Sequence, residues 1–341
     1  MTRALAVLSA LVVALIVASP AAAQTRPNGP WIEDNQNVSL ERLHDYEELT
    51  AALQRIQQRS AGRVDVRSIG TTNEGRDIWA ATVGTGPTDV LYITQQHGDE
   101  PLGTEAALQL LQQLGTSRSP AVREILSELT VTVVVRANPD GAELFQRQNV
   151  DPACAGAFCE PGVGYDINRY HDPSVAPEDN PVPEAAAIRR LYDELDPAIV
   201  VDYHHQGTYV DAGGDMITAS VFWPNAAGVD AGVIDASKQV TRLIYDTPMP
   251  FGYANVSQYP GGENPGIARN AFGLMGSASV LMEVRGVGQK SSGKLIRTFY
   301  EAMWAVLEAA ADGSLDTIDP SLADAIPERG PSVSDPTPPE E

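Results

Sequence analysis

A histidine and two carboxylates stand together at residues 97–100 (HGDE), directly after an apolar run. A second group, at residues 202–205 (DYHH), also follows an apolar run. A catalytic zinc site needs three protein ligands drawn from His, Asp and Glu, with one position left open for water. The histidine and the second carboxylate of the first group could supply two ligands, and either His204 or His205 could supply the third. An isolated loop histidine is usually structural, but three of the five histidines lie in these two polar groups.

Further polar groups follow or interrupt apolar runs. They are residues 136–141 (RANPDG) with Arg147 after them, residues 165–169 (YDINR), and Glu283 within the run VLMEVR. A carboxylate inside a buried strand needs a partner or a catalytic role. These positions are therefore candidates for the same site as the histidines.

Helical and strand patterns alternate along the chain and would position these groups. Apolar runs typical of buried strands cover residues 90–94, 130–138, 198–205 and 277–286, and helical spacing of apolar residues covers 40–58, 103–115, 184–195 and 294–310. Strands interleaved with helices predict an α/β fold, a single domain with a mixed, largely parallel central sheet flanked by helices. In such sheets ligands bind beyond the carboxyl ends of the strands, so the polar groups should meet there.

The two ends of the chain differ in composition from the rest. Residues 1–23 combine one arginine, an apolar stretch and a closing Ala-Ala-Ala, which is the pattern of a secretory signal peptide. A membrane anchor is the alternative, but the run is shorter than the roughly 20 residues of a span, and Pro20 breaks it. We expect a secreted protein, or a periplasmic one if the cell has an outer membrane, with no membrane span after signal removal. The catalytic domain should cover residues 24–314, and the acidic, proline-rich residues 315–341 should be disordered.

Charge and cysteine content exclude some functions. The formal net charge is −22, and without clustered Lys and Arg a nucleic acid is not an expected partner. The two cysteines, Cys154 and Cys159, are close in sequence. In an exported protein this spacing favours a local disulfide over a free pair or half of a metal site.

The order of these motifs resembles the zinc carboxypeptidase family, the M14 metallopeptidases. A His-x-x-Glu pair is followed by NPDG, an arginine, Asp-x-Asn-Arg, an Asp-x-His strand end, and a late glutamate in a strand followed by arginine. Each motif alone is weak, but six in the family's order are specific, and together they span most of the chain. The resemblance implies the zinc carboxypeptidase fold.

The resemblance also implies one zinc ion per chain, bound by His97, Glu100 and His204. His204 is preferred to His205 because the family's ligand follows Asp-x, which here is Asp202 and the tyrosine after it. Ligands of these types also bind other divalent metals. Zinc is therefore implied by the family resemblance and not by the ligand types alone.

Catalytic and substrate-binding roles follow from the same resemblance. Glu283 is implied as the general base that takes a proton from the attacking water, and Arg147 as the group that stabilises the oxyanion. Asn168 and Arg169 would bind a substrate carboxylate, which a guanidinium matches in geometry. Asp166 would hold a ligand histidine in one tautomer.

The implied function is a secreted zinc metallocarboxypeptidase that cleaves the C-terminal peptide bond of peptides with a free C-terminal carboxylate. The HGDE motif also resembles family members that trim peptidoglycan stem peptides, and deacylases of N-acyl amino acids. A catalytically inactive binding module would have lost Glu283 or a ligand, and none is lost. Neither Tyr253 nor Tyr259 has the context of the family's substrate-covering tyrosine, and we interpret Arg269 as a surface residue. The sequence carries no signature of the oligomeric state.

Overall fold

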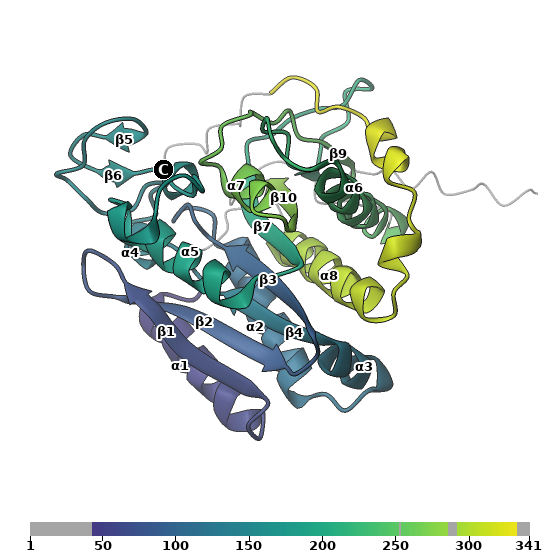
Figure 1. Cartoon of the computed structure of the whole chain (residues 1–341), viewed down its shortest axis with the longest axis horizontal. Helices are drawn as coiled ribbons and strands as arrows, with labels where there is room; N and C mark the ends of the chain where they lie inside the picture. The colour runs from purple at the N-terminus through teal and green to yellow at the C-terminus, as the bar shows by residue number, and fades with distance from the viewer. Residues whose placement is uncertain (1–42, 252–253, 286–291, 333–341) are drawn as a thin grey trace, which may run out of the picture.

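The computed structural model describes residues 43–251, 254–285 and 292–332 (Figure 1). The predicted signal peptide and Tyr253 lie outside the described residues. The helices are α1 (Tyr46–Arg59), α2 (Leu102–Thr116), α3 (Pro120–Glu128), α4 (Pro139–Glu143), α5 (Pro183–Leu195), α6 (Ala231–Asp246), α7 (Ala268–Leu274) and α8 (Ser292–Ala311). Short 3-10 helices are η3 (Ile167–Arg169), η4 (Pro177–Asp179), η5 (Met249–Phe251), η6 (Leu315–Thr317) and η7 (Pro320–Ala325).

One mixed sheet forms the centre of the molecule. Its strands are β1 (Val64–Thr71), β2 (Asp77–Gly84), β3 (Thr88–Thr94), β4 (Leu129–Val134), β7 (Ile199–Gln206), β8 (Ala219–Phe222), β9 (Val256–Gln258) and β10 (Ala278–Arg285). They lie in the order β1-β2-β4-β3-β7-β10-β8-β9, and the central run from β4 to β10 is parallel. A separate hairpin pairs β5 (Cys159–Glu160) with β6 (Gly164–Tyr165). The predicted α/β domain with a mixed, largely parallel sheet is confirmed.

Helices cover both faces of this sheet (Figure 1). In β3, Val90 and Tyr92 join the core under α1, α2 and α8, whereas Leu91 and Ile93 join the core under α5 and α7. Successive side chains of a strand point to opposite faces, so a strand covered on both sides must be apolar throughout. This explains the continuous apolar runs from which the strands were predicted.

The capping residues explain where the first helix begins. Helical spacing predicts residues 40–58, and α1 begins at Tyr46 because the Asp45 side chain accepts a hydrogen bond from the backbone N–H of Glu48. The Glu48 side chain in turn accepts from the Asp45 N–H, which completes a capping box.

No helix among the described residues has the length and hydrophobicity needed to cross a membrane.

The C-terminal segment differs from its prediction. Residues 315–332 are ordered: η6 and η7 lie beside α6, and Leu315, Ala323 and Ile326 are buried. The segment runs up past α6 and over the top of the molecule in Figure 1, where it is drawn in yellow. The prediction of disorder is therefore wrong for residues 315–332, because a few well-placed apolar residues and long-range backbone pairing compensate for the polar composition. Residues 333–341 lie outside the described part of the chain.

A buried carboxyl in α5 gives a prediction about stability. Glu184 is fully buried in the first turn of the helix, where its Oε2 accepts a hydrogen bond from Asn149 Nδ2 at 2.9 Å. Burial raises the pKa of Glu184 from 4.5 to about 7. Between these two values the folded protein keeps a proton that the unfolded chain has lost, so stability falls as the pH rises through this window. Above about pH 7 Glu184 is ionised in the folded protein too, and the loss of folding stability stays at its full value.

We expect Glu184→Gln to remove this dependence. The shift from 4.5 to about 7 corresponds to on the order of 3 kcal/mol, so the variant should gain up to that amount over wild type between pH 5 and pH 8. Urea unfolding of both proteins at several pH values measures the difference. The surface charges are the same in both proteins, so any pH dependence of the stability difference comes from Glu184. A stability difference that does not change with pH would contradict the assignment.

Candidate metal centre

Three buried side chains converge at the carboxyl ends of β3 and β7. The candidate ligand atoms of His97, Glu100 and His204 all lie within 4.8 Å of one another. Glu100 lies between the rings, with Oε1 at 2.8 Å from His97 Nδ1 and Oε2 at 2.8 Å from His204 Nδ1. The two Nδ1 atoms are 3.0 Å apart. Ligands around a tetrahedral zinc with Zn–N near 2.1 Å are separated by about 3.3 Å, so this spacing fits the ion closely.

Two carboxylates fix the orientation of the histidine rings. Asp166 Oδ1 lies 3.1 Å from His97 Nε2, and Asp202 Oδ2 lies 2.7 Å from His204 Nε2. Each carboxylate accepts a hydrogen bond from the Nε2–H of its ring, and in this tautomer the Nδ1 lone pair points at the other ligands. Two lone pairs and a carboxylate that face one another repel unless a cation lies between them. The donor set therefore fits a divalent metal, and zinc in particular.

The backbone between β3 and α2 brings His97 and Glu100 together. Gln95 adopts a left-handed φ of 56°, which turns the chain away from the strand direction. Gly98 lies directly against the NPDG turn, where an added Cβ would come within 2.1 Å of the Gly141 carbonyl carbon. Only glycine fits this position, which explains the glycine in the HGDE motif.

The strand alternation separates the two neighbouring histidines of β7. His204 faces the cluster, whereas His205 Nε2 accepts a hydrogen bond from the backbone N–H of Leu102 at 3.2 Å, at the start of α2. His205 also stacks on Phe299 of α8. Burial lowers the pKa of His205 to about 4, so it is neutral, as a hydrogen-bond acceptor must be. The choice of His204 as the candidate ligand agrees with this geometry.

The carboxylates of the cluster are held in their ionised form. Burial alone raises the pKa of Asp166, but the hydrogen bond from His97 and the charges of Arg147 and Arg169 outweigh it and hold the pKa well below its usual range. In the metal-free protein the burial of Glu100 is likewise outweighed by the two histidine rings, whose protons hold its pKa well below the ordinary value; a bound metal would take the place of those protons. Ionised carboxylates are the form in which these groups bind a metal or orient its ligands.

Arg147 reaches the cluster, as the sequence predicts. Its Nη2 donates to Asp166 Oδ2 at 2.9 Å, and its Nη1 lies 3.2 Å from His97 Nδ1 and 3.7 Å from Glu100 Oε1. The side chain remains 38% exposed, so it faces both the candidate metal ligands and the solvent. A positive charge in this position could interact with a ligand bound at the metal.

The two residues predicted to bind a substrate carboxylate occupy different environments. Asn168 is buried behind His204, with Nδ2 donating to Asp202 Oδ2 at 3.3 Å and Oδ1 accepting from the Ala268 N–H at 2.7 Å. Arg169 is 26% exposed, and its Nη1 donates to the Asn168 carbonyl at 2.6 Å. Arg169 is therefore partly open to solvent, as substrate binding requires, whereas Asn168 supports the Asp202 carboxylate that orients His204.

The two cysteines form the predicted disulfide, between Cys154 and Cys159. Within the loop that it closes, Phe158 is 49% exposed and lies 5.8 Å from the Arg169 guanidinium. The Phe158 carbonyl accepts a hydrogen bond from the Asp166 N–H at 2.9 Å. The disulfide therefore closes a loop that contacts the metal cluster through Asp166.

Glu283 lies beside the cluster on the adjacent strand. In the parallel ladder of β10 and β7 it pairs with His204, and paired residues of neighbouring strands point to the same face. Glu283 is buried, and burial raises its pKa to about 7, with His204 opposing the shift. A carboxylate whose pKa lies near neutrality is suited to accept and release a proton.

Sequence reasoning missed several residues around the site. Gln96 Nε2 donates to Asp202 Oδ2 at 2.8 Å, and Gln96 Oε1 lies 2.6 Å from His171 Nε2, so the two residues support the carboxylate that orients His204. The Asp-x-His spacing was the available signal for Asp202. Arg329 of the C-terminal segment lies 4.0 Å from Glu283 Oε2, and no local pattern pointed to it.

The interpretation of Arg269 as a surface residue is wrong. Its side chain is 1% exposed and lies over the Phe222 ring, 4.8 Å from the centroid. Its Nη2 donates to the Gly262 carbonyl and to Asn225 Oδ1, so it ties the loop after β9 to α7. The burial lowers the pKa of Arg269 to about 10, and the group remains charged at neutral pH.

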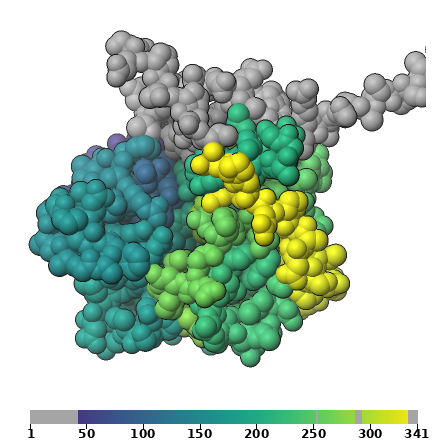
Figure 2. Space-filling view, turned by 90° about the horizontal axis from the view of Figure 1, so that it is seen from above, coloured from purple at the N-terminus to yellow at the C-terminus, as the bar shows by residue number. Residues whose placement is uncertain are grey.

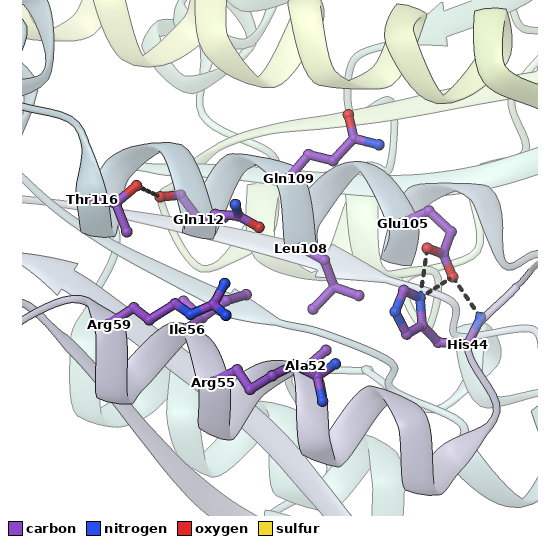
Figure 3. A pocket seen from close by; sticks show the side chains of 10 residues that line it. All are labelled: His44, Ala52, Arg55, Ile56, Arg59, Glu105, Leu108, Gln109, Gln112 and Thr116. Atoms are coloured by element: carbon purple, nitrogen blue, oxygen red, sulfur yellow. Dashed lines mark hydrogen bonds and ion pairs between the residues drawn. The ribbon is translucent and has the colours of Figure 1, made fainter.

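A groove of about 220 Å³ lies elsewhere, between α1 and α2 (Figure 3). Its residues include Arg55 and Arg59 of α1 and Leu108 of α2, and His44 pairs with Glu105 at its end. None of the candidate metal ligands lines this groove. The groove is therefore separate from the metal cluster.

The zinc carboxypeptidase family model matches residues 49–220, which is half of the chain. The chain belongs to the zinc carboxypeptidase family. The match includes both candidate histidine ligands, Glu100, Arg147 and Arg169. Glu283 lies beyond the matched residues, so its assignment depends on the register of β10 with β7.

Curated relatives of this zinc carboxypeptidase family member include carboxypeptidase M of Mus musculus, 28% identical over 138 residues, which are 38% of this chain and 30% of the relative. Carboxypeptidase 2 of Trichophyton rubrum is 26% identical over 211 residues, which are 56% of this chain and 36% of the relative. The matched part of the chain thus spans about a third of the length of these relatives. The solved metallo-carboxypeptidase from Burkholderia cenocepacia has the same fold, with a TM-score of 0.63 at 18% identity over 80% of this chain and 70% of that one.

Proposed function

We propose that the protein is a secreted zinc metallocarboxypeptidase that hydrolyses the C-terminal peptide bond of peptides. The observation that carries the proposal is the cluster of His97, Glu100 and His204, with Arg147 and Glu283 beside it, in a member of the zinc carboxypeptidase family. Secretion is inferred from the pattern of residues 1–23 and is supported by the disulfide.

The cluster residues have separate roles in this proposal. His97, Glu100 and His204 hold the zinc, which when bound supplies a Lewis acid that polarises the substrate carbonyl and lowers the pKa of water. Glu283 accepts the proton of the attacking water at its carboxylate and delivers it to the departing amine. In the metal-free protein burial raises its pKa to about 7, so this carboxylate takes up a proton more readily than an exposed glutamate.

Two arginines contact the peptide in this proposal, one at its free C-terminus and one at the carbonyl that is attacked. Arg169 is partly exposed and its guanidinium can form a bidentate contact with the terminal carboxylate of a peptide. Asn168 bonds to the Asp202 carboxylate and to the backbone of α7, and so fixes the position of Arg169 next to it. Arg147 faces the carbonyl oxygen on which negative charge develops.

Loss of Arg147 is expected to affect the chemical step. We expect Arg147→Met, which keeps an unbranched side chain without the charged end group, to lower kcat by about 10²–10³-fold, the usual cost of removing an oxyanion donor. Steady-state kinetics with a blocked dipeptide measures this. Arg189, a part-buried arginine of α5, provides the matched control, because Arg189→Met should stay near wild-type activity. A change in KM alone for Arg147→Met would contradict the assignment.

The proposed function is tested by hydrolysis of a substrate panel by the purified mature protein. The panel contains N-blocked dipeptides with different C-terminal residues, peptidoglycan stem peptides and N-acyl amino acids, each with and without a chelator. Release of C-terminal residues that stops with chelator and returns with zinc supports the proposal. Cleavage of stem peptides alone would support a cell-wall enzyme, cleavage of N-acyl amino acids alone a deacylase, and bound zinc without any cleavage a binding role.

A further inference from the structure

The C-terminal segment brings an arginine to the general base. Arg329 Nη1 lies 4.0 Å from Glu283 Oε2, and the two side chains are only 8% and 11% exposed. The same Nη1 donates to Gln206 Oε1 at 2.6 Å, at the carboxyl end of β7. A nearly buried guanidinium beside a buried carboxylate is a strong interaction, because water screens it little.

Two tyrosines hold the guanidinium in place. The Arg329 Cζ lies 3.5 Å from the centroid of the Tyr209 ring and 4.5 Å from that of Tyr259. Arginine stacks on aromatic rings in this way through its planar, weakly hydrated guanidinium. The stacking and the Gln206 contact restrict the side chain to one position, 4.0 Å from Glu283.

Backbone pairing fixes the segment that carries this arginine. Gln258 at the end of β9 donates from its N–H to the Pro327 carbonyl at 2.7 Å and accepts from the Arg329 N–H at 3.0 Å. Further on, the Val210 N–H donates to the Pro331 carbonyl at 3.2 Å. The segment thus bridges β9 and the chain after β7. Figure 2 shows these C-terminal residues in yellow across one face of the molecule.

We propose that Arg329 is a positioning residue for the reaction, and that residues 326–332 are thereby an integral part of the catalytic unit. The proposal deepens the proposed function and rests on it. Arg329 orients the Glu283 carboxylate toward the metal cluster and fixes Tyr259 beside it. The alternative is a C-terminal segment that covers the site and hinders the substrate. The contacts of Arg329 favour the supporting role, because its guanidinium bonds to Gln206 of β7 and stacks on the tyrosines that follow β7 and β9.

The test compares Arg329→Gln, Arg329→Lys and Glu328→Ala in the otherwise complete mature chain. Glu328 is the matched control, because it pairs in the same backbone ladder but its side chain is exposed. We expect Arg329→Gln to lower kcat about 10- to 100-fold with little change in KM, as for a misplaced catalytic group. Arg329→Lys should recover part of the loss, and Glu328→Ala should stay within twofold of wild type. An unchanged kcat in Arg329→Gln overturns the proposal, and so does an increased kcat, which would mean that the C-terminal segment hinders the reaction.

A second measurement does not depend on activity. In metal-free protein, Arg329→Gln leaves the Glu283 carboxylate buried without its cation, so we expect the variant to lower Tm more in the wild-type background than in Glu283→Gln. If Arg329→Gln lowers Tm equally in wild type and in Glu283→Gln, the two side chains do not interact and the proposal fails. If wild type hydrolyses no peptide, the proposed function fails, whereas active wild type with an unaffected Arg329→Gln variant removes only the inference about Arg329.

Discussion

Replacing Glu283 by glutamine is expected to reduce kcat/KM for peptide hydrolysis by about 10²–10⁴-fold, the usual contribution of a general base. Glutamine keeps the size of the side chain and removes the site that accepts the proton. Since Glu283 is buried and burial raises its pKa to about 7, the neutral amide should fit the site without loss of stability. Zinc content should be unchanged, because Glu283 is not in the ligand cluster.

Glu184→Gln is the matched control for this variant. Glu184 is also a buried carboxyl with a pKa raised to about 7, but it lies in α5 and contacts Asn149 rather than the cluster. We expect its activity to remain within twofold of wild type. Comparable losses in both variants would mean that a buried charge matters for the fold rather than for the chemistry. Full activity in Glu283→Gln would remove Glu283 from the mechanism.

The parts of the site that the sequence predicts are those whose signals are local. His97 and Glu100 stand three residues apart at the end of an apolar run, and His204 stands at the end of another. Because β3 and β7 are parallel neighbours, these ends meet at one edge of the sheet. Strand alternation then separates His204 from His205, in agreement with the choice of His204 that the family resemblance implied from the position of Asp202.

The parts that were missed depend on contacts distant in sequence. Arg329 is 46 residues from Glu283, in a segment whose composition predicts disorder. Its order arises from pairing with Gln258 and from the burial of Ile326, neither of which a window of sequence contains. Arg269 was misjudged for a related reason, since its burial follows from the packing of Phe222 and the loop after β9. Composition measures the average cost of ordering a segment, whereas a few long-range contacts decide the outcome.

Replacing His204 by glutamine is expected to abolish both metal binding and hydrolysis. His204 supplies one of three candidate ligand atoms, and its Nδ1 has no substitute within the cluster. Loss of a residue that only orients a ligand costs about 10–100-fold in metal affinity, so loss of a ligand should cost more than about 100-fold. Metal analysis after dialysis against a weak chelator should find close to one zinc per wild-type chain and almost none in the variant.

The neighbouring residues make this experiment specific. His205→Gln changes the adjacent histidine, which faces α2 and binds the Leu102 N–H, so zinc content and activity should be retained. Asp202→Asn should give an intermediate result, because Asp202 only fixes the His204 ring through its contact with Nε2 at 2.7 Å. The order of zinc affinity should thus be wild type and His205→Gln, then Asp202→Asn, then His204→Gln. If His205→Gln lost zinc and His204→Gln kept it, the ligand assignment would have to move to His205, and β7 would have to present its opposite face to the metal.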